Sequence, residues 1–234
     1  MKKERLDRFL SNQLNISRSE SRTSIRRGTV QVNGKTVRDY GFLLSPGVNT
    51  VMYDGREVEY RRFIYLMMNK PAGIITASND KSRKTVLDLV PDHLRRHNLA
   101  PVGRLDKDTT GLLLFTDDGD FAHKCISPKN TIEKSYVAEL DGDINESIVA
   151  DFENGVVLCD GYRCKPAKLS NLQNGLVRIV ITEGKYHQIK RMFGVFSLGV
   201  NSLHREAFGG LKLPDDLAPG ECVELPDISD FIVF

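Results

Sequence analysis

The first apolar positions of the chain recur at intervals of three and four residues, which is the spacing of one helix face. They are Leu6, Phe9, Leu10 and Leu14. A capping box follows, in which the Ser17 hydroxyl accepts from the backbone N–H of Glu20 and the Glu20 carboxylate reaches back to Ser17. The pattern predicts a short amphipathic helix and then a second helix, which Gly28 is placed to end.

Two turn signals come after these helices. An alternating apolar stretch at 30–32 leads into Asn33-Gly34, a dipeptide typical of a type I′ hairpin. Asp54-Gly55 marks a second hairpin, between strands at 50–53 and 56–60. The beginning of the chain is therefore predicted to form two helices followed by a small sheet.

From residue 63 onward, apolar runs typical of buried strands alternate irregularly with stretches at helical spacing. We expect strands at 63–68, 74–76, 112–116, 136–140 and 176–182. We expect helices at 85–90, 120–126, 148–153 and 187–196. Because hairpin turns recur, the pattern predicts an α+β fold with a mainly antiparallel mixed sheet flanked by helices. The two predicted domains are 1–62 and 63–234.

Length and composition allow one or two globular domains: the chain has 234 residues, of which 40% are hydrophobic and 27% charged. Collagen-like, coiled-coil and disordered classes are excluded. The net charge of +2 argues at first against a polyanionic partner. Residues 1–62, however, hold 13 Lys and Arg against seven Asp and Glu, so they carry +6 and residues 63–234 carry −4. The chain is thus a small basic module attached to a mildly acidic body.

Three arginines of the second predicted helix, Arg18, Arg22 and Arg26, lie four residues apart and share one face, with Arg27 beside it. A solvated charged face is the ordinary explanation of such a stripe. Here Glu20 is the one acid nearby in the helix, and like charges at this spacing repel each other. The stripe therefore indicates an anionic partner that binds through phosphate.

Candidate chemistry is concentrated in polar segments at the ends of predicted strands. In the turn at 102–111, Arg104 and Asp106 flank Leu105, so they share one face if the segment is extended. The alternative is an ordinary loop with a surface ion pair. Tyr136 opens a later strand, where packing against the core or edge is the usual role of a tyrosine.

A second polar segment runs from Glu183 to Met192 and joins a strand end to a helix start. His187 and Arg191 share a face of that helix, while Lys190 points elsewhere. A helix N-terminus with incidental charge is the alternative. The sequence has no P-loop, no G-x-S-x-G, no H-E-x-x-H and no G-x-G-x-x-G after a strand. Its five scattered histidines and four cysteines without C-x-x-C spacing predict no metal site.

The N-terminus is charged and leads into no apolar segment, so we expect no secretory signal. No stretch approaches ~18 uninterrupted apolar residues, the length that a transmembrane helix needs. We expect a cytoplasmic protein with reduced thiols and no membrane contact.

The basic module holds four characteristic stretches, which are Arg5-Leu6-Asp7, Ser17-Arg18-Ser19, Ile25-Arg26-Arg27-Gly28 and Val30-Gln31-Val32-Asn33-Gly34. By their order and spacing, residues 5–54 resemble an S4 RNA-binding domain, whose two helices are presented to structured RNA. The resemblance implies that this module binds the shape and phosphates of RNA. The residues assigned to RNA binding are Arg5, Ser17, Arg18, Arg22, Arg26, Arg27 and Lys35.

The larger body holds a series of short motifs, which are Asn69-Lys70-Pro71-Ala72-Gly73, Gly103-Arg104-Leu105-Asp106, Thr110-Gly111-Leu112-Leu113, Lys134-Ser135-Tyr136, His187-Gln188-Ile189-Lys190-Arg191-Met192 and Leu203-His204-Arg205. In content and order they are similar to those of the bacterial rRNA pseudouridine synthases of the RsuA family. The resemblance implies conversion of a uridine within RNA to pseudouridine, in which the base leaves ribose at N1 and rejoins it through C5. No electron is transferred and no group is lost, so no cofactor is expected.

By the same resemblance, Asp106 is the essential nucleophile, and it adds to C6 of uracil, attacks C1′ of ribose or assists glycal formation. Tyr136 stacks on the uracil, and Lys190 is the basic partner of Asp106, with Arg191 as the second choice. A base stacked in duplex RNA cannot reach Asp106, so the target is flipped out or unpaired. The substrate-binding residues implied are Arg104, Arg191 and Leu203.

Members of this family differ in their rRNA target. The chain ends 25 residues after Gly209 without a basic extension, and this short form is most similar to the members that act on small-subunit rRNA. We expect the target to be position 516 of 16S rRNA, in free rRNA or an assembling small subunit, and the enzyme to be a monomer. The alternatives are a 23S rRNA uridine and a non-catalytic rRNA-binding or assembly protein. Retention of Asp106, Tyr136 and Lys190 argues against the latter.

Overall fold

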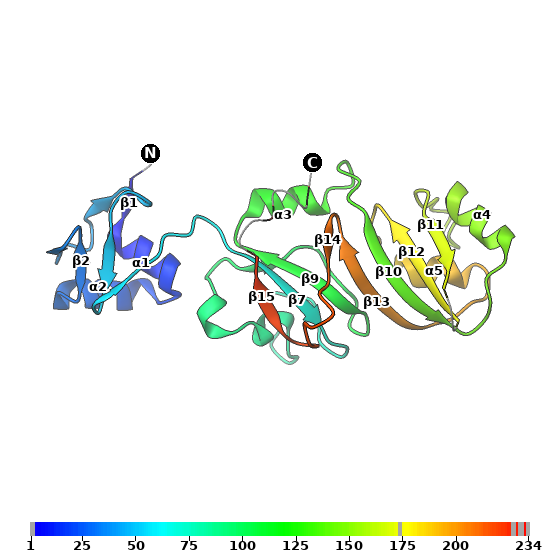
Figure 1. The fold of residues 1–234 in the computed structure, drawn as a ribbon, viewed down its shortest axis with the longest axis horizontal. Helices are drawn as coiled ribbons and strands as arrows, with labels where there is room; N and C mark the ends of the chain where they lie inside the picture. Colours follow the sequence, from blue (N-terminus) through cyan, green and yellow to red (C-terminus); the bar gives the residue numbers. More distant parts are fainter. Residues whose placement is uncertain (1–2, 173–174, 226–227, 229–231, 233–234) are drawn as a thin grey trace. The chain divides into compact units, whose positions relative to one another are not determined.

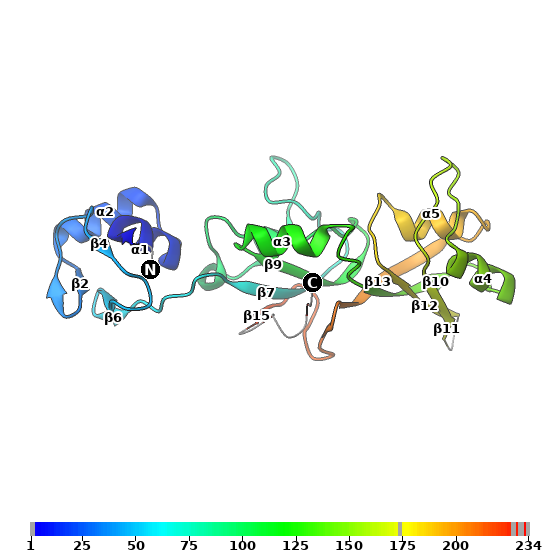
Figure 2. The same cartoon turned by 90° about the horizontal axis from the view of Figure 1, so that it is seen from above.

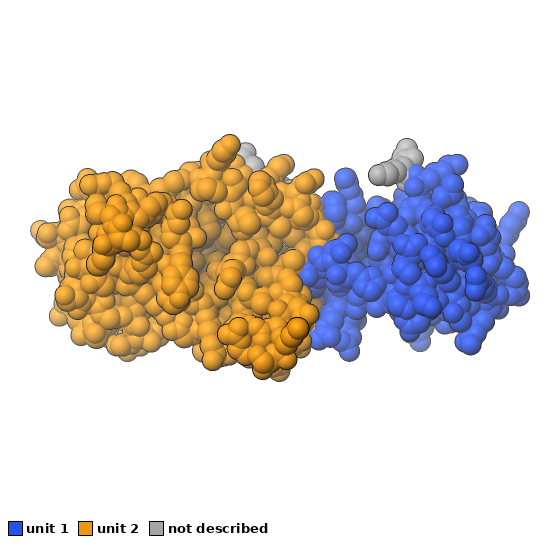
Figure 3. Space-filling view, turned by 180° about the vertical axis from the view of Figure 1, so that it is seen from behind, with its two compact units in different colours: residues 1–64, 91–99 blue, residues 65–90, 100–234 orange. Residues whose placement is uncertain are grey.

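The computed structural model describes residues 3–172, 175–225, 228 and 232. The chain forms two compact units (Figure 3). The first consists of residues 1–64 and 91–99, and the second of residues 65–90 and 100–234. The segment 91–99 was predicted to belong to the second domain, but its residues are part of the first unit, where their side chains contact α1. Arg96 Nη2 donates to Gln13 Oε1 over 3.0 Å, and His97 Nε2 is hydrogen-bonded to Ser11 Oγ over 3.1 Å.

The first unit contains both predicted helices, α1 (Leu6–Leu14) and α2 (Arg18–Arg27). The capping box at Ser17 is confirmed, and Gly28 ends α2 with a left-handed φ of 83°. One apolar core joins the helices to the strands. Its buried residues are Leu6, Phe9, Leu10, Ile25, Val30, Val32, Leu44, Val51 and Val58. The helical spacing of the apolar residues thus identified the buried face of α1 correctly.

The predicted hairpins form a small antiparallel sheet in the order β3-β2-β5-β6. Asn33 and Gly34, like Asp54 and Gly55, both have positive φ, as a type I′ turn requires. A separate two-stranded sheet pairs β1 with β4. The strands of this unit are β1 (Glu4–Arg5), β2 (Val30–Val32), β3 (Lys35–Thr36), β4 (Leu43–Leu44), β5 (Val51–Tyr53) and β6 (Arg56–Glu57).

The second unit is built on one mixed sheet, in which β11-β12-β10-β13-β9-β7-β15 follow one another and β14 and β8 pair with β13 and β9 (Figure 1). Among the described residues, β13 and β9 form the one parallel pair. The mainly antiparallel mixed sheet is therefore confirmed. Its strands are β7 (Tyr65–Lys70), β8 (Ala100–Pro101), β9 (Thr110–Thr116), β10 (Lys134–Leu140), β11 (Lys168–Asn171), β12 (Leu176–Ile181), β13 (Val200–Phe208), β14 (Leu211–Lys212) and β15 (Cys222–Glu224).

Among the described residues of this unit, three α-helices pack against the sheet, and α3 and α5 lie over the same side of it (Figure 2). They are α3 (Gly119–Ile126), α4 (Glu146–Asn154) and α5 (Gln188–Gly194). Cys125 of α3 lies in one apolar cluster with Met67, Leu112 and Leu114. The α4 and α5 helices meet through Phe152 and Phe193, whose ring centroids are 4.9 Å apart. Within the described part of the chain, no helix is long and apolar enough to cross a membrane.

One local prediction for this unit is wrong, because residues 74–76 form an isolated bridge between Ile75 and Thr85 in place of a strand. The helix predicted at 85–90 is present as the short 3₁₀ helix η1 (Val86–Leu89). A second 3₁₀ helix, η2 (Asp92–Leu94), lies in the segment that belongs to the first unit. The long strand β13 was not predicted, because its buried positions include Arg205 and its apolar pattern is broken.

The contact between β13 and β9 depends on a glycine. A Cβ atom at Gly111 would lie 2.3 Å from the Arg205 carbonyl oxygen, and Gly111 has a φ of 100°. Only glycine combines this backbone conformation with so close an approach. The Thr110-Gly111 motif therefore brings β13, and with it Arg205, against the strand that follows the Asp106 turn.

Candidate active site

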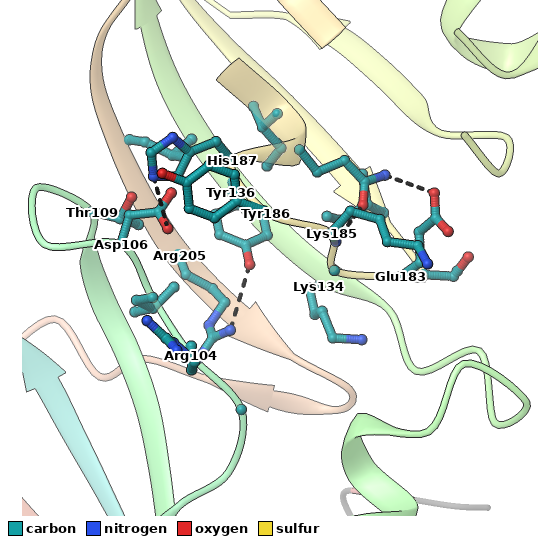
Figure 4. A pocket seen from close by; sticks show the side chains of 18 of the residues that line it. Arg104, Asp106, Thr109, Lys134, Tyr136, Glu183, Lys185, Tyr186, His187 and Arg205 are labelled. Atoms are coloured by element: carbon teal, nitrogen blue, oxygen red, sulfur yellow. Dashed lines mark hydrogen bonds and ion pairs between the residues drawn. The ribbon is translucent and has the colours of Figure 1, made fainter. Parts of the chain in front are cut away.

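A cavity of about 820 Å³ opens on the second unit, where segments distant in sequence come together (Figure 4). The turn at 102–109, strands β10 and β13, and the loop before α5 all contribute to its lining. The predicted site residues that line it are Arg104, Asp106, Tyr136, Lys190 and Leu203. The structure thus brings five of the six residues predicted for catalysis and substrate binding to one place.

Asp106 lies in a turn that is held from both sides. Thr76 Oγ1 donates to the Leu105 carbonyl oxygen over 2.7 Å, and the backbone N–H of Thr109 donates to the Asp106 carbonyl oxygen over 3.2 Å. The Asp106 side chain is 30% exposed, so it is accessible from the cavity. Its Oδ1 lies 3.6 Å from Nε2 of His187. A carboxylate presented on a fixed turn has the placement that a nucleophile needs.

The expected pairing of Lys190 with Asp106 is not what the structure shows. Lys190 Nζ donates to Asp108 Oδ2, and this hydrogen bond holds the pKa of Asp108 below its usual range. His187 stands at the start of α5 and reaches Asp106, while Lys190, one turn later, reaches the exposed Asp108. Sequence spacing alone could not distinguish two carboxylates that are two residues apart in a turn.

Tyr136 and Arg205 form the floor of the cavity from neighbouring strands. Arg205 is 2% exposed, and its Nε donates to the Leu112 carbonyl oxygen over 2.7 Å. Its Nη1 lies 3.4 Å from the Tyr136 hydroxyl, and the guanidinium carbon is 5.9 Å from the centre of the Tyr136 ring (Figure 4). Nη2 has no hydrogen-bond partner in the described structure. A buried cation with a free donor beside a cavity suits an oxygen atom of a ligand.

Arg205 has no role among the sequence predictions, although the residue lies in the closing Leu203-His204-Arg205 motif. The sequence pattern that could have identified Arg205 is its position in a strand, two residues after an apolar residue. Residues two apart in a strand share one face, so this arginine lies on the same face as the apolar residue. The apolar residue is Leu203, which is buried and lines the cavity.

Two lysines give the site further positive charge. Lys134 lines the cavity, and its Nζ donates to the Ile132 carbonyl oxygen over 2.7 Å. Burial, together with the nearby charge of Arg205, lowers the pKa of Lys134 to about 8. Lys70 is fully buried, and its Nζ donates to the carbonyl oxygens of Pro71, Lys107 and Thr109. Burial lowers the pKa of Lys70 to about 8, against the opposing effect of Asp108 and Asp106.

Arg191 is the one predicted substrate residue that does not line this cavity. Its Nη2 donates to Asp160 Oδ2, and its Nη1 donates to the Tyr186 carbonyl oxygen over 3.4 Å. Arg191 follows Lys190 by one residue on α5, and adjacent helix positions point about 100° apart. Arg104, by contrast, is exposed and lines the cavity. Among the described residues, no cluster of three or more His, Cys, Asp or Glu has the arrangement to hold a metal ion.

In the first unit, the arginine stripe has an acidic partner that was not predicted. Arg5, Arg18 and Arg22 all bind the Asp7 carboxylate, over 3.2, 3.0 and 2.9 Å. Burial of Asp7 by itself would raise its pKa, but the hydrogen bonds from these arginines lower it to about 2. Asp7 belongs to α1, so a pattern within α2 could not reveal it.

The remaining predicted RNA-binding residues are on the surface of the same unit. The guanidinium of Arg26 lies 5.0 Å from the centre of the Tyr40 ring, which Arg5 and Arg22 also approach. Arg27 and Lys35 are exposed. The Ser17 hydroxyl accepts from the backbone N–H of Glu20, so its first role is to cap α2.

Known proteins are similar to both units. A family model described as RNA pseudouridylate synthase matches residues 64–194, and the S4 domain model matches residues 4–49. The chain is 40% identical over 227 residues to the "Uncharacterized RNA pseudouridine synthase YtzG" of Bacillus subtilis (strain 168), a match that covers 95% of each chain. It is 40% identical over 219 residues to the "Ribosomal small subunit pseudouridine synthase A" of Escherichia coli (strain K12), covering 93% of this chain and 94% of the relative.

A solved structure agrees with these relatives. The crystal structure of a pseudouridylate synthase superimposes with a TM-score of 0.69 at 33% identity, and covers 98% of this chain and 99% of the other. The chain therefore belongs to the RNA pseudouridylate synthase family, with an S4 domain at its N-terminus. It is an RNA pseudouridine synthase, which is an isomerase.

Proposed function

We propose that this enzyme converts the uridine at position 516 of 16S rRNA to pseudouridine, with Asp106 as its nucleophile and the target base flipped out of its stack. The observation that carries the proposal is the accessible Asp106 carboxylate in one cavity with Tyr136 and Arg205. The name of the Escherichia coli relative supports the choice of small-subunit rRNA.

The reaction is an isomerisation in which one bond is exchanged for another. The bond between N1 of uracil and C1′ of ribose breaks, and a bond between C5 and C1′ forms. The hydrogen of C5 is lost as a proton and N1 gains one, so the atoms balance without an oxidant or a cofactor. Asp106 acts by addition to C6, by attack on C1′ or by assisting removal of the 2′ proton.

The neighbouring side chains suit the binding of a flipped uridine. Tyr136 offers an aromatic face to the uracil, and Leu203 supplies an apolar wall. The free Nη2 of Arg205 donates to an oxygen of the uracil, the ribose or a phosphate. Arg104, exposed at the cavity, holds the nucleotide's backbone. Lys190 keeps Asp108 in place beside Asp106.

The two domains have separate functions, RNA binding and catalysis. The S4 domain, at 1–62, binds rRNA through Arg5, Arg18, Arg22, Arg26, Arg27 and Lys35, and Ser17 keeps its helix in place. Asp7 holds three of these arginines in fixed positions, which lowers the conformational entropy that they lose on binding phosphate. The catalytic domain, at 63–234, performs the chemistry. The enzyme acts in the cytoplasm as a monomer, on free rRNA or an assembling small subunit.

Mapping of pseudouridines tests this proposal directly. Total rRNA from cells that lack the gene is compared with rRNA from the parent strain and from a strain complemented with the gene. We expect loss of pseudouridine at position 516 of 16S rRNA and its return on complementation. Loss at a 23S rRNA position would favour the alternative target, and unchanged rRNA would favour a non-catalytic binding or assembly role.

A further inference from the structure

An aromatic pair at the cavity has no part in the chemistry described above. Tyr186 has the largest exposed fraction, 76%, among the exposed large apolar side chains of the described structure. Its ring stacks on that of His187, with centroids 3.8 Å apart and an angle of 17° between the planes. Both residues line the cavity (Figure 4). One aromatic face is thus presented to solvent beside the site of reaction.

The segment that carries this pair is rigidly built. Gln188 is buried, and its Oε1 accepts from the backbone N–H of Lys185 over 2.9 Å, while its Nε2 donates to Glu183 over 2.8 Å. Glu183 is also buried, and it accepts from the Tyr162 hydroxyl and the backbone N–H of Lys165. Side chains on both sides of Tyr186 therefore fix the backbone that presents it.

The backbone of His187 shows that this placement has a cost. His187 has a φ of 48° and a ψ of 34°, the left-handed conformation. For a residue other than glycine this conformation is strained, because the Cβ atom crowds the following carbonyl oxygen. Tyr186 does not offset the cost by entering the core, because most of its surface stays in water. Backbone strain of this kind is concentrated at active sites and ligand-binding segments.

The chemistry of the pair fits a nucleobase. Unpaired RNA bases are held by stacking on aromatic side chains, which requires a flat ring with a free face and no particular base edge. Lys185 is exposed, lines the same cavity and supplies positive charge for the RNA backbone. His187 Nε2 is 3.6 Å from Asp106 Oδ1, so the stack begins directly beside the carboxylate.

We infer that Tyr186 and His187 form a stacking platform for the nucleotide adjacent in the RNA chain to the target uridine. The inference rests on the proposed function, because it needs a target uridine whose base enters the cavity at Asp106. A neighbouring base on the platform holds the strand open at the point where the target leaves its stack.

The test combines a protein variant with an altered RNA. The RNA is a hairpin of 16S rRNA sequence around position 516, intact or with an abasic ribose at the 5′ or the 3′ neighbour of the target. Binding affinity and single-turnover rate are measured separately for wild type, Tyr186→Ala and Tyr186→Phe. Val157→Ala, an exposed apolar position that does not line the cavity, is the control.

We expect Tyr186→Ala to weaken RNA binding by about 5- to 150-fold, the range measured for loss of one stacked base, while Tyr186→Phe stays within about twofold of wild type. RNA with an abasic ribose at one of the two neighbours binds wild-type enzyme more weakly than intact RNA does. The same abasic RNA binds Tyr186→Ala about as well as intact RNA does, because the stacking contact is already lost. Three results would each overturn the platform. The first is that the losses from Tyr186→Ala and from an abasic ribose add together at both neighbours of the target. The others are unchanged RNA binding by Tyr186→Ala, and equal losses of binding in Tyr186→Ala and Tyr186→Phe. Failure of wild type to form pseudouridine in the intact hairpin would instead count against the proposed target, since binding is read independently.

Discussion

The buried ammonium group of Lys70 donates a hydrogen bond to the Thr109 carbonyl oxygen over 2.9 Å, and so ties the end of β7 to the turn that carries Asp106. The same nitrogen also donates to the carbonyl oxygens of Pro71 and Lys107. Three backbone acceptors at the Asp106 turn and the end of β7 therefore depend on one side chain.

Replacement of Lys70 by methionine should disturb both stability and turnover. The three carbonyl oxygens lose their charged donor, which costs about 1–3 kcal/mol of unfolding free energy. Since the Asp106 turn loses its anchor, we also expect kcat to fall more than KM rises. Urea denaturation and steady-state kinetics measure the two effects. Lys107→Met, at an exposed position of the same turn, is the control, and wild-type behaviour of Lys70→Met would contradict the anchoring role.

Arg205→Lys tests the free guanidinium nitrogen. Lysine keeps the charge, but its single nitrogen cannot bond the Leu112 carbonyl oxygen and also supply the unpaired donor that Nη2 provides at the cavity lining. We expect kcat/KM to fall by roughly 10- to 100-fold, the effect of losing one hydrogen bond to a charged group. Arg178→Lys, on an exposed arginine outside the cavity lining, should have little effect. Equal kcat/KM in Arg205→Lys and wild type would show that Nη2 does not meet the substrate.

Asp7 should make the stability of the S4 domain depend on pH in the acid range. Its pKa in the folded protein is about 2, below the ordinary value of 3.8, so the unfolded chain binds the proton more readily. The stabilisation is therefore complete above pH 3.8 and is lost as the pH falls toward 2. Hydrogen exchange of the α1 and α2 amides should show a difference between wild type and Asp7→Asn that shrinks over this interval. A constant difference, or the same loss in the turn variant Asp54→Asn, would contradict the assignment.

The arginines that Asp7 holds should contribute to the salt dependence of RNA binding. Arg18→Ala combined with Arg22→Ala removes two cations of the stripe. We expect weaker binding and a slope of log K against log salt that is smaller by about 1 for each phosphate group that the variant no longer neutralises. Fluorescence anisotropy from low to high salt measures the slope, with Arg56→Ala, exposed in the same unit, as the control. An unchanged slope in the double variant would remove the stripe from the RNA interface.

Local rules predicted the parts of the fold in which a few neighbouring residues determine the backbone. Ser17 and Gly28 mark the ends of α2, and Asn33-Gly34 forms a turn with two positive φ angles, as expected. Strand β13 was not predicted, because Arg205 occupies a buried position that is ordinarily apolar. Its burial makes sense only with the cavity and the Leu112 carbonyl oxygen beside it, and both depend on tertiary structure.

The site shows the same division between local and tertiary information. The motifs identified the segments that carry Asp106, Tyr136 and Lys190, and the structure brings these segments to one cavity. Which carboxylate meets which cation was not predictable, because Lys190 and His187 are one helical turn apart and reach different acids. Asp7 was missed for a related reason, since its three arginine partners come from different elements.

Asp106→Asn tests whether Asp106 is the nucleophile of pseudouridine formation. The amide keeps the size of the side chain but removes its negative charge, so RNA should bind with near wild-type affinity. Asp108→Asn, which removes the neighbouring carboxylate that binds Lys190, is the matched control and should retain turnover. The measurement is the yield of pseudouridine in a single-turnover reaction on RNA that contains the target uridine. We predict no detectable pseudouridine with Asp106→Asn, and a yield close to that of wild type would exclude Asp106 as the nucleophile.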